Sequence, residues 1–355
     1  MLSRKVLMLA GSIAVVGANA LTLSPIAGAV AASFPGVDAP GVMKAAAVYG
    51  LATAVGSLLW APAIDRIGQR RGLLRALAAL VAALAVSAGA PSLPVLCLGQ
   101  ALAGLAAGCA LPAIYALSAR IAEKGRESET LGIVLTGWTV SLVAGVGLSA
   151  LVADLAHWRL VFAGLAVAAA WLARGVGRNR DWDLPVLPAR PSSPLSALRV
   201  RGMVPALVVV AVYMTAFYGL YAYLGPHLTG VLRLPTASAG LAPAAYGLGF
   251  GLAAFMDRLL DRHGAVAAAP LAFLGLVLVY AGLAAASGQA AVLIAMCLAW
   301  GLANHVGLNL IVGRLTALNP ARRGAVMGLY GTVTYLAASA GAFFYRPLSS
   351  DILSR

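Results

Sequence analysis

Residues 61–71 read APAIDRIGQRR and form the first strongly charged break in a chain that is otherwise nearly continuous hydrocarbon. Apolar segments flank the stretch on both sides, so we expect a short loop between two membrane-spanning helices. Part of the pattern returns once, at residues 261–264, as DRHG. A chain that repeats such a loop is predicted to consist of two related halves.

The composition places the chain in a lipid bilayer. Hydrophobic residues make up 61% of it and charged residues 10%, whereas soluble globular proteins carry roughly 25% charged residues. The apolar runs between charge clusters are long enough, as helices, to cross roughly 30 Å of hydrocarbon. We predict an all-α polytopic membrane protein with eleven spans, near residues 6–33, 42–64, 73–90, 94–118, 130–153, 158–176, 203–226, 237–259, 266–286, 290–313 and 325–345.

The net charge of +14 raises the question of a nucleic-acid partner, and the location of the charge answers it. If the N-terminus is cytoplasmic, 20 of the 25 Lys and Arg side chains fall on the inner side, which is the positive-inside pattern. The outer side keeps Lys44, Arg159, Arg233, Arg346 and Arg355. We therefore expect no nucleic acid, and a multi-pass protein of the cell inner membrane with a cytoplasmic N-terminus and a periplasmic C-terminus.

The first span has some features of a signal peptide, because Arg4-Lys5 precede an apolar run and Ala18-Asn19-Ala20 resemble a cleavage site. Its apolar length exceeds the 7–15 residues usual in such a segment, so we expect it to be retained. The three cysteines, Cys97, Cys109 and Cys297, all fall inside spans, with no disulfide framework or metal-ligand spacing. The sequence predicts no cofactor and no metal.

Registering the two halves on the repeated Asp gives an offset of 196 residues. Three landmarks agree with this offset within one residue: Asp65 with Asp261, Arg126–Gly132 with Arg322–Gly328, and Gly104-Leu105-Ala106 with Gly301-Leu302-Ala303. The agreement supports an internal repeat.

The same register defines the expected domains. Arg159, which opens span six, maps onto Arg355, the last residue, so the counterpart of span six, a twelfth helix, is expected to be absent. We predict an N-terminal six-helix half (1–176), a proline-rich cytoplasmic linker (177–202) and a C-terminal half with five helices and a short outer tail (203–355).

These motifs resemble the major facilitator superfamily, particularly its twelve-span drug/proton antiporter branch, which includes arabinose-efflux-like permeases. The resemblance covers most of residues 5–345. The matching pieces are Asp65-Arg66-x-Gly68-x-Arg70-Arg71 after span two, Gly104-x-x-x-Gly108 in span four, the glycine-rich span five followed by Trp158-Arg159, and Tyr221-x-Tyr223-Leu224-x-Pro226-x-Leu228 in span seven. The resemblance implies a two-half helical bundle with inverted repeats, in which spans one, four, seven and ten line a central cavity and spans three, six, nine and twelve lie outermost.

The sequence departs from the family pattern at three positions. The usual leading Gly of the loop is Ala61, the usual Pro of span five is Gly147, and the Arg expected in span four is Gln100. The resemblance assigns that Arg a role in proton coupling, so its replacement argues against inherited proton antiport.

We interpret the charged loop and its repeat as a conformational latch. Positive-inside topology does not require an Asp, yet one ends a span in each half. Such a carboxylate would pair with a cation or a helix N-terminus of the other half. The predicted latch residues are Asp65, Arg66, Gly68, Arg70, Arg71, Asp261 and Arg262. The alternative is that the cations only anchor cytoplasmic loops.

Polar and aromatic side chains at membrane depth are the candidates for a substrate cavity. Polar groups must find partners or water there, and three aromatic residues of span seven share one helix face. The candidates are Asn19, Gln100, Tyr115, Tyr213, Phe217, Tyr221, Asn304, His305 and Asn309. For each polar candidate the alternative is interhelical hydrogen bonding. Few carboxylates lie nearby, which favours a neutral or amphipathic solute.

His305 is the candidate for proton coupling, because imidazole changes charge near neutral pH. Burial alone would keep it neutral. Asp257 is the alternative, and we expect it at the cytoplasmic edge of its span.

The sequence therefore predicts a secondary active transporter, and not an enzyme, that moves a small organic solute by alternating access. The resemblance favours efflux. An uptake permease of the same fold and a degenerate, non-transporting membrane sensor are the alternatives. No paired acids or Ser-His-Asp grouping occurs in the spans. The expected partners are the solute and the bilayer, with protons as a candidate coupling ion, and we expect a monomer.

Overall fold

The computed structural model describes residues 4–122, 127–179, 182, 194–253, 265–319 and 323–353, and these residues form helices and no strand. The N-terminal part contains α1 (Arg4–Leu21), α2 (Leu23–Ala31), α3 (Ala39–Ile67), α4 (Gln69–Ala88), α5 (Leu93–Ile121), α6 (Glu127–Val140), η1 (Ser141–Val146), α7 (Gly147–Leu155) and α8 (Trp158–Arg178). The C-terminal part contains η3 (Pro194–Arg199), α9 (Met203–Pro226), η4 (His227–Val231), α10 (Thr236–Ala239), α11 (Leu241–Leu252), α13 (Ala265–Ala285), α14 (Ala290–Leu318) and α15 (Arg323–Leu353). The all-α prediction is confirmed.

Within the described residues, ten helices are long and apolar enough to cross a membrane. They correspond to ten of the eleven predicted spans. The eighth prediction, 237–259, begins as α10 and α11, which follow each other across Gly240, and the remainder of it lies outside the described residues. The span prediction therefore holds wherever the structure tests it.

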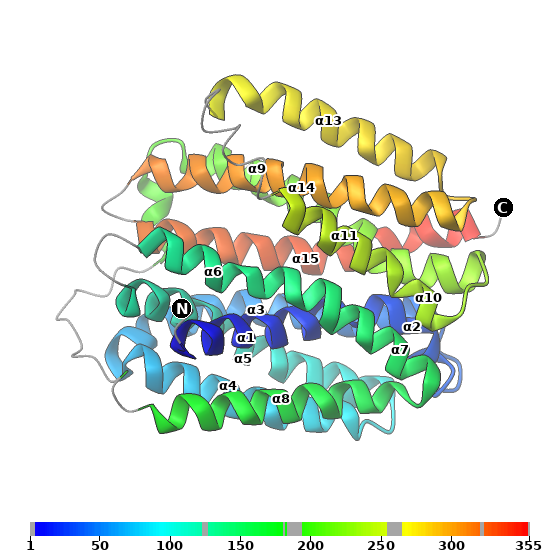
Figure 1. The fold of residues 1–355 in the computed structure, drawn as a ribbon, viewed down its shortest axis with the longest axis horizontal. Helices are drawn as coiled ribbons and strands as arrows, with labels where there is room; N and C mark the ends of the chain where they lie inside the picture. Colours follow the sequence, from blue (N-terminus) through cyan, green and yellow to red (C-terminus); the bar gives the residue numbers. More distant parts are fainter. Residues whose placement is uncertain are drawn as a thin grey trace.

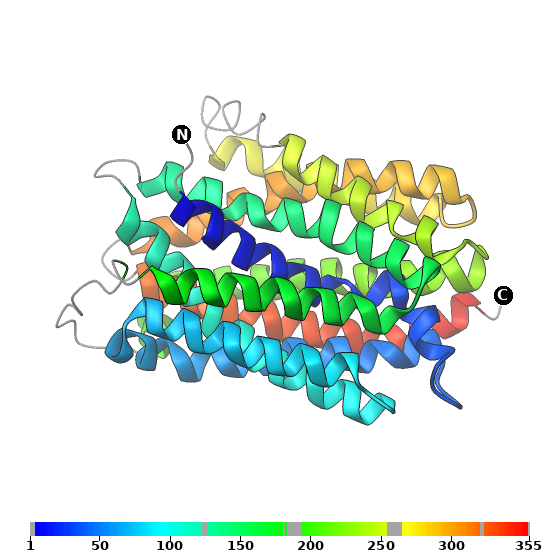
Figure 2. The same cartoon turned by 60° about the horizontal axis from the view of Figure 1, so that its bottom comes forward.

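The helices lie side by side along the long axis of the molecule (Figures 1 and 2). The helix α1 begins near the left of Figure 1, where α8 ends and the 177–202 segment starts, and we name this the linker end. The helices α2, α7 and α10 lie toward the opposite end, where α15 finishes. The first helix therefore begins at one end of the bundle, and the last helix finishes at the other.

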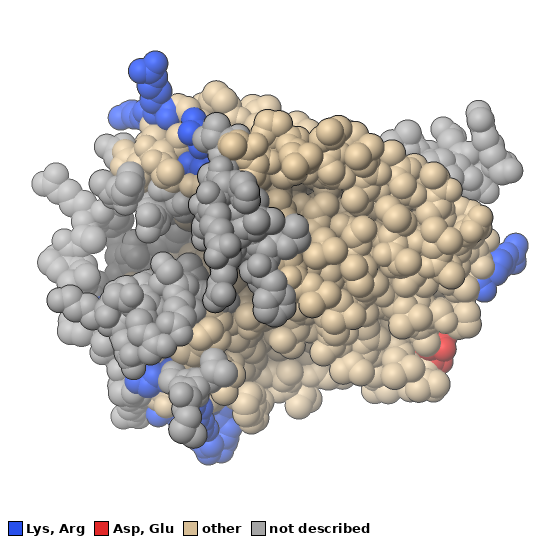
Figure 3. Space-filling view, turned by 45° about the horizontal axis from the view of Figure 1, so that its top comes forward, with Lys and Arg blue, Asp and Glu red and all other residues tan. Residues whose placement is uncertain are grey.

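The face of the bundle seen in Figure 3 is uncharged between its two ends. The figure shows Lys, Arg and Asp/Glu side chains near the ends, with only uncharged residues among the described ones between them. The outward face of α13 is typical, because Leu271, Leu274, Val277 and Leu278 are all more than half exposed. Hydrocarbon is the solvent that suits such a face.

The first span is interrupted just before Pro25, because α1 ends at Leu21 and α2 starts at Leu23. Proline has no N–H, so Pro25 cannot donate to the carbonyl of Leu21 four residues earlier. That carbonyl must find another partner.

The predicted repeat reappears as a repeated helix contact. A Cβ on Gly104 of α5 would collide with the Tyr49 carbonyl and press on the Thr53 amide of α3. A Cβ on Gly301 of α14 would meet Tyr246 and Phe250 of α11 in the same way. The three pairs, Gly104/Gly301, Tyr49/Tyr246 and Thr53/Phe250, share an offset of 197, one residue from the sequence register. Glycine at both positions permits the close backbone approach.

Buried apolar side chains form two clusters. One is drawn mainly from residues 6–182 and the other mainly from residues 197–337. The first includes Trp182, which lies in the predicted linker and is 2% exposed. Part of this segment is therefore packed against the N-terminal helices, a contact that its polar composition did not predict.

Candidate functional site

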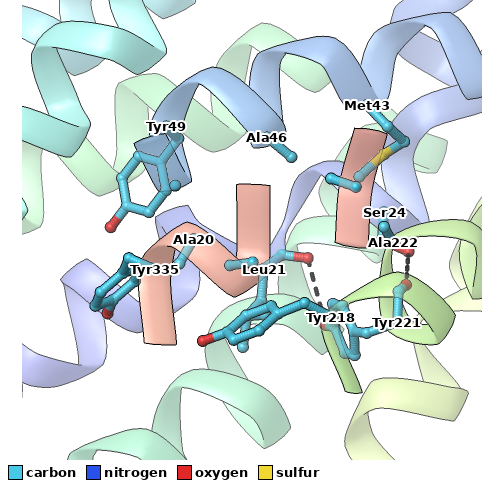
Figure 4. A pocket seen from close by; sticks show the side chains of 13 residues that line it. Ala20, Leu21, Ser24, Met43, Ala46, Tyr49, Tyr218, Tyr221, Ala222 and Tyr335 are labelled. Carbon is cyan, nitrogen blue, oxygen red and sulfur yellow. Dashed lines mark hydrogen bonds between the residues drawn. The ribbon is translucent and has the colours of Figure 1, made fainter. Parts of the chain in front are cut away.

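A small chamber lies where helices of the N-terminal part, α1–α8, meet helices of the C-terminal part, α9–α15 (Figure 4). We call these the two sets of helices. Its volume is about 30 Å³, room for a few water molecules at most. The lining comes from α1, α2, α3, α9 and α15: Ala20, Leu21, Ser24, Met43, Ala46, Tyr49, Gly50, Tyr218, Tyr221, Ala222, Tyr335, Ala338 and Ala342. The wall thus combines four tyrosines with small apolar side chains and contains no charged residue.

The four tyrosine hydroxyls fall into two groups. The hydroxyl of Tyr221 donates to the Leu21 carbonyl at 3.3 Å, and that of Tyr49 donates to the Val16 carbonyl at 3.5 Å. For Tyr218 and Tyr335, the described residues provide no hydrogen-bond partner to the hydroxyl. Two phenolic groups on the wall are therefore available to a solute.

One side of the chamber is closed by hydrogen bonds between α1–α2 and α9. The Tyr221 hydroxyl donates to the Leu21 carbonyl, which has no donor from Pro25 because proline lacks an N–H. In return, the Ser24 hydroxyl donates to the Tyr221 carbonyl at 2.6 Å (Figure 4). The same hydroxyl accepts from the Gly225 amide at 3.2 Å. We name these bonds among Leu21, Ser24, Tyr221 and Gly225 the gate contact. Gly225 is required there, because a Cβ would collide with the Ser24 carbonyl.

Other close approaches join the two sets of helices nearby. A Cβ on Gly50 of α3 would lie 3.0 Å from the Tyr335 carbonyl of α15, and one on Gly240 would lie 2.6 Å from the Ala150 side chain of α7. Gly28 of α2 faces Thr229 of η4. Together with the gate contact, these approaches close the part of the bundle away from the linker end.

Two predicted cavity residues instead bond to each other. The Asn19 amide donates to Gln100 Oε1 at 3.1 Å, and Gln100 Nε2 donates to Asn19 Oδ1 at 3.3 Å and to Ser87 Oγ at 3.1 Å. Both amides are at most 1% exposed. This pair matches the alternative interpretation, interhelical hydrogen bonding, and it joins α1, α4 and α5.

The aromatic face of α9 and the amide of α14 belong to one cluster. The Tyr213 hydroxyl donates to the Asn304 carbonyl at 2.6 Å, and the Asn304 amide donates to the Tyr246 hydroxyl at 2.9 Å. The ring of Phe217 lies 5.4 Å from the rings of both Tyr246 and Trp300. Of the predicted cavity residues, the structure brings together Tyr213, Phe217, Tyr221 and Asn304.

The remaining cavity candidates lie apart from the chamber. His305 is half-buried and packs edge-on against Phe250, with ring centroids 4.8 Å apart. Tyr115 is half-buried and interacts with the Trp138 side chain, and Asn309 is exposed. The assignment of His305 to proton coupling stays a prediction.

The predicted latch residues have separate structural roles where the structure describes them. Arg70 donates from Nε to the Val176 carbonyl at 3.1 Å and from Nη2 to the Gly177 carbonyl at 2.8 Å. Its guanidinium therefore caps the C-terminal end of α8 in its own half, where a cation is favoured. The expected loop at residues 61–71 is wrong in extent, because α3 runs to Ile67 and α4 begins at Gln69. Gly68 alone joins them, with φ +87°, a positive value that suits glycine.

The rest of the latch stays a prediction. Arg71 is exposed. Asp65 and Arg66 lie near the end of α3, and their side chains are outside the described part of the structure. Asp261 and Arg262 lie outside the described residues altogether, as does Asp257.

The sequence interpretation missed several chamber residues. The resemblance implied spans one, four, seven and ten as lining, whereas spans two and eleven supply Tyr49 and Tyr335 here. A usable signal was the tyrosine beside a glycine in an apolar span, Tyr49-Gly50 and Tyr218-Gly219. Such glycines permit close helix approach beside the aromatic ring.

Comparison with known proteins places this architecture among transporters. The chain is 26% identical over 347 residues to the uncharacterized MFS-type transporter YwfA of Bacillus subtilis, covering 94% of this chain and 82% of that protein. It is 28% identical to a chloramphenicol resistance protein of Streptomyces lividans and 25% identical to a probable sugar efflux transporter of Mannheimia succiniciproducens. Those two alignments cover 63% and 67% of this chain and 60% of each relative.

The fold likeness extends over nearly the whole chain. The crystal structure of a D-xylose-proton symporter superposes with a TM-score of 0.78 at 15% identity, covering 96% of this chain and 89% of the other. The sequence profile of the Major Facilitator Superfamily matches residues 6–342. With its bundle of span-length helices, the chain belongs to the Major Facilitator Superfamily, a family of membrane transporters and not of enzymes.

Proposed function

We propose that the chain exports an uncharged, amphipathic organic solute by alternating access. The observation that carries the proposal is the chamber between the two sets of helices, whose wall holds four tyrosine rings and no charged residue. A dedicated site for an ion would need a compensating charge at this depth, because an unpaired charge in the membrane interior is costly. An uncharged solute needs only apolar surface and a few hydrogen bonds.

The size of the chamber supports a conformational cycle. A volume of about 30 Å³ is far below the roughly 300–1,000 Å³ of typical ligand pockets. The chamber must therefore widen before a solute enters, and the gate contact must break before a solute leaves on that side. Rocking of one half against the other supplies both movements.

The sidedness follows from the positive-inside rule. Arg4, Lys5, Arg70, Arg71 and Arg178 all lie at the linker end, so we assign this end to the cytoplasm of a cell inner membrane. The gate contact then closes the external side of a chain that acts as a monomer. We propose outward transport because two relatives are named for chloramphenicol resistance and sugar efflux.

Chloramphenicol is a suitable first probe. It is uncharged and carries an aromatic ring, an amide and two hydroxyls, which match tyrosine rings, apolar walls and the hydroxyls of Tyr218 and Tyr335. A sugar is the second candidate, supported by the relative named as a sugar efflux transporter. The chamber favours the first, because a sugar carries many hydroxyls and the described wall offers few uncommitted polar atoms.

Everted membrane vesicles test the proposal, because export from the cell becomes accumulation in the vesicle. Vesicles that contain the protein should accumulate radiolabelled chloramphenicol above protein-free vesicles when energised, and should not accumulate arabinose. Accumulation of arabinose alone would indicate that the solute is a sugar. Accumulation of neither chloramphenicol nor arabinose would indicate a non-transporting sensor. Collapsing the pH gradient during the assay tests whether protons drive the transport.

A further inference from the structure

The side-chain amide of Asn304 is buried and only partly bonded. It lies on α14, is 3% exposed, and donates from Nδ2 to the Tyr246 hydroxyl at 2.9 Å. Its Oδ1 is buried and has no hydrogen-bond partner among the described residues. Turning the amide over would leave the nitrogen unpaired instead, so one polar atom lacks a partner in either orientation.

An unpaired amide is unusual at this depth. Buried polar side chains are almost always hydrogen-bonded, and each exception needs an explanation. The other buried amides of the described spans, Asn19 and Gln100, form a reciprocal pair. Among the buried amides of the described residues, the open position is therefore specific to Asn304, although buried side-chain atoms of Thr22, Trp182, Trp300 and Thr334 also lack a partner.

Aromatic rings surround the amide. Trp300 lies one turn earlier on the same face of α14, and its ring centroid is 4.8 Å from that of Tyr246. The Trp300 indole nitrogen has no partner of standard hydrogen-bond geometry among the described residues, although the Tyr280 phenol lies close enough to interact with it. The amide is thus surrounded by aromatic rings, and both its oxygen and the neighbouring indole N–H lack a partner of standard geometry among the described residues.

Phe217 connects this amide to the chamber. Its ring contacts Tyr218 and Tyr221, which line the chamber, at 4.8 and 5.8 Å. On its other side it contacts Tyr246 and Trp300. Phe217 therefore lies between residues of the chamber wall and the aromatic rings beside Asn304.

We propose that Asn304 is the polar anchor of a second solute subsite, which opens behind Phe217 when the chamber widens. This inference rests on the proposed function and specifies it further. The subsite selects uncharged solutes in which a hydroxyl adjoins an aromatic or apolar body. The Asn304 carboxamide bonds the polar group, and Trp300 and Tyr246 pack against the body.

Binding of chloramphenicol to the full-length protein in lipid nanodiscs tests this assignment. We expect Asn304→Leu to weaken the dissociation constant about tenfold, the effect of one lost hydrogen bond to a buried group. Chloramphenicol with both hydroxyls acetylated should bind wild type and Asn304→Leu with equal affinity, because it has no hydroxyl to donate. Thr332→Val is the matched control, since Thr332 is a buried polar residue of the same half whose hydroxyl bonds its own helix at Gly328.

The outcomes separate the two levels of the proposal. Wild type that does not bind chloramphenicol overturns the proposed solute class, and with it this subsite. Equal affinity of wild type and Asn304→Leu for chloramphenicol would overturn the subsite alone. An equal loss of affinity for chloramphenicol and for its diacetylated form would also overturn it, because Asn304 would then only shape the wall. If Asn304→Leu does not fold, the double variant Asn304→Leu/Tyr246→Phe replaces it, because that variant leaves no orphaned phenol.

Discussion

The gate contact predicts a graded response to two substitutions. In Tyr221→Phe the Leu21 carbonyl loses its partner, and Pro25 cannot replace it. In the open state water can reach this carbonyl, so the substitution penalises only the closed state. In Ser24→Ala the Tyr221 carbonyl and the Gly225 amide can pair with each other as in an ordinary helix. The closed state therefore loses less stability in Ser24→Ala than in Tyr221→Phe.

The magnitudes follow from the bonds that are lost. An unsatisfied buried carbonyl costs roughly 1–3 kcal/mol, and interhelical hydrogen bonds in membranes average about 0.6 kcal/mol. We take the closed state to be destabilised relative to the open state by ~1 kcal/mol in Tyr221→Phe and by ~0.5 kcal/mol in Ser24→Ala. These losses raise the open-to-closed ratio about fivefold and about twofold, respectively.

Cysteine accessibility measures this ratio. Ala46 lines the chamber, so Ala46→Cys in a background without Cys97, Cys109 and Cys297 reports access from the gated side to a membrane-impermeant maleimide. The labelling rate should rise about fivefold with Tyr221→Phe and about twofold with Ser24→Ala.

The control is another tyrosine of the same helix. The Tyr223 hydroxyl donates to the Ala342 carbonyl at 2.7 Å, a contact between α9 and α15 of one half. Tyr223→Phe should therefore leave the labelling rate unchanged. Equal rates in Tyr221→Phe and Tyr223→Phe would refute the reasoning, because they would show that the gate contact does not hold the closed state.

Three further predictions concern residues outside the chamber. Gln100→Leu orphans the amide of Asn19, so the free energy of unfolding should fall by roughly 1–3 kcal/mol; thermal unfolding in detergent measures this, and an unchanged midpoint would contradict the reciprocal pair. Arg70→Lys cannot bond both terminal carbonyls of α8 with a fork of donors, so stability should fall by about 1 kcal/mol while Ala46→Cys labelling stays at the wild-type rate; a changed rate would favour a latch role instead. His305→Gln should abolish the response of chloramphenicol flux to a pH gradient if His305 carries the proton, and a retained response would remove it from that role.

The sequence predicted those parts of the fold that depend on local pattern. The length of the apolar runs located the spans, and the repeated charged motifs at Asp65 and Asp261 set a repeat register that the contacts of Gly104 and Gly301 reproduce within one residue. The break in the first span near Pro25 also follows from local sequence, because proline lacks an N–H.

The partners of individual polar side chains were not predictable in this way. Asn19 and Gln100 are 81 positions apart, and their pairing depends on how α1 turns its face toward α5. The sequence pattern led us to interpret Arg70 as part of a conformational latch. Its bonds to α8 depend instead on where that helix ends, 106 positions later in the chain. Tyr335 lines the chamber because α15 approaches α3 closely at Gly50, a tertiary contact that has no local signal beside Tyr335.

The central claim, that the tyrosine-lined chamber receives the uncharged solute, is tested most directly by solute protection of Ala46→Cys. Chloramphenicol should slow maleimide labelling at this position in proportion to its occupancy. It should leave Asp154→Cys, an exposed position at the same end of the bundle, unaffected. Full labelling of Ala46→Cys at chloramphenicol concentrations that saturate transport would contradict the account.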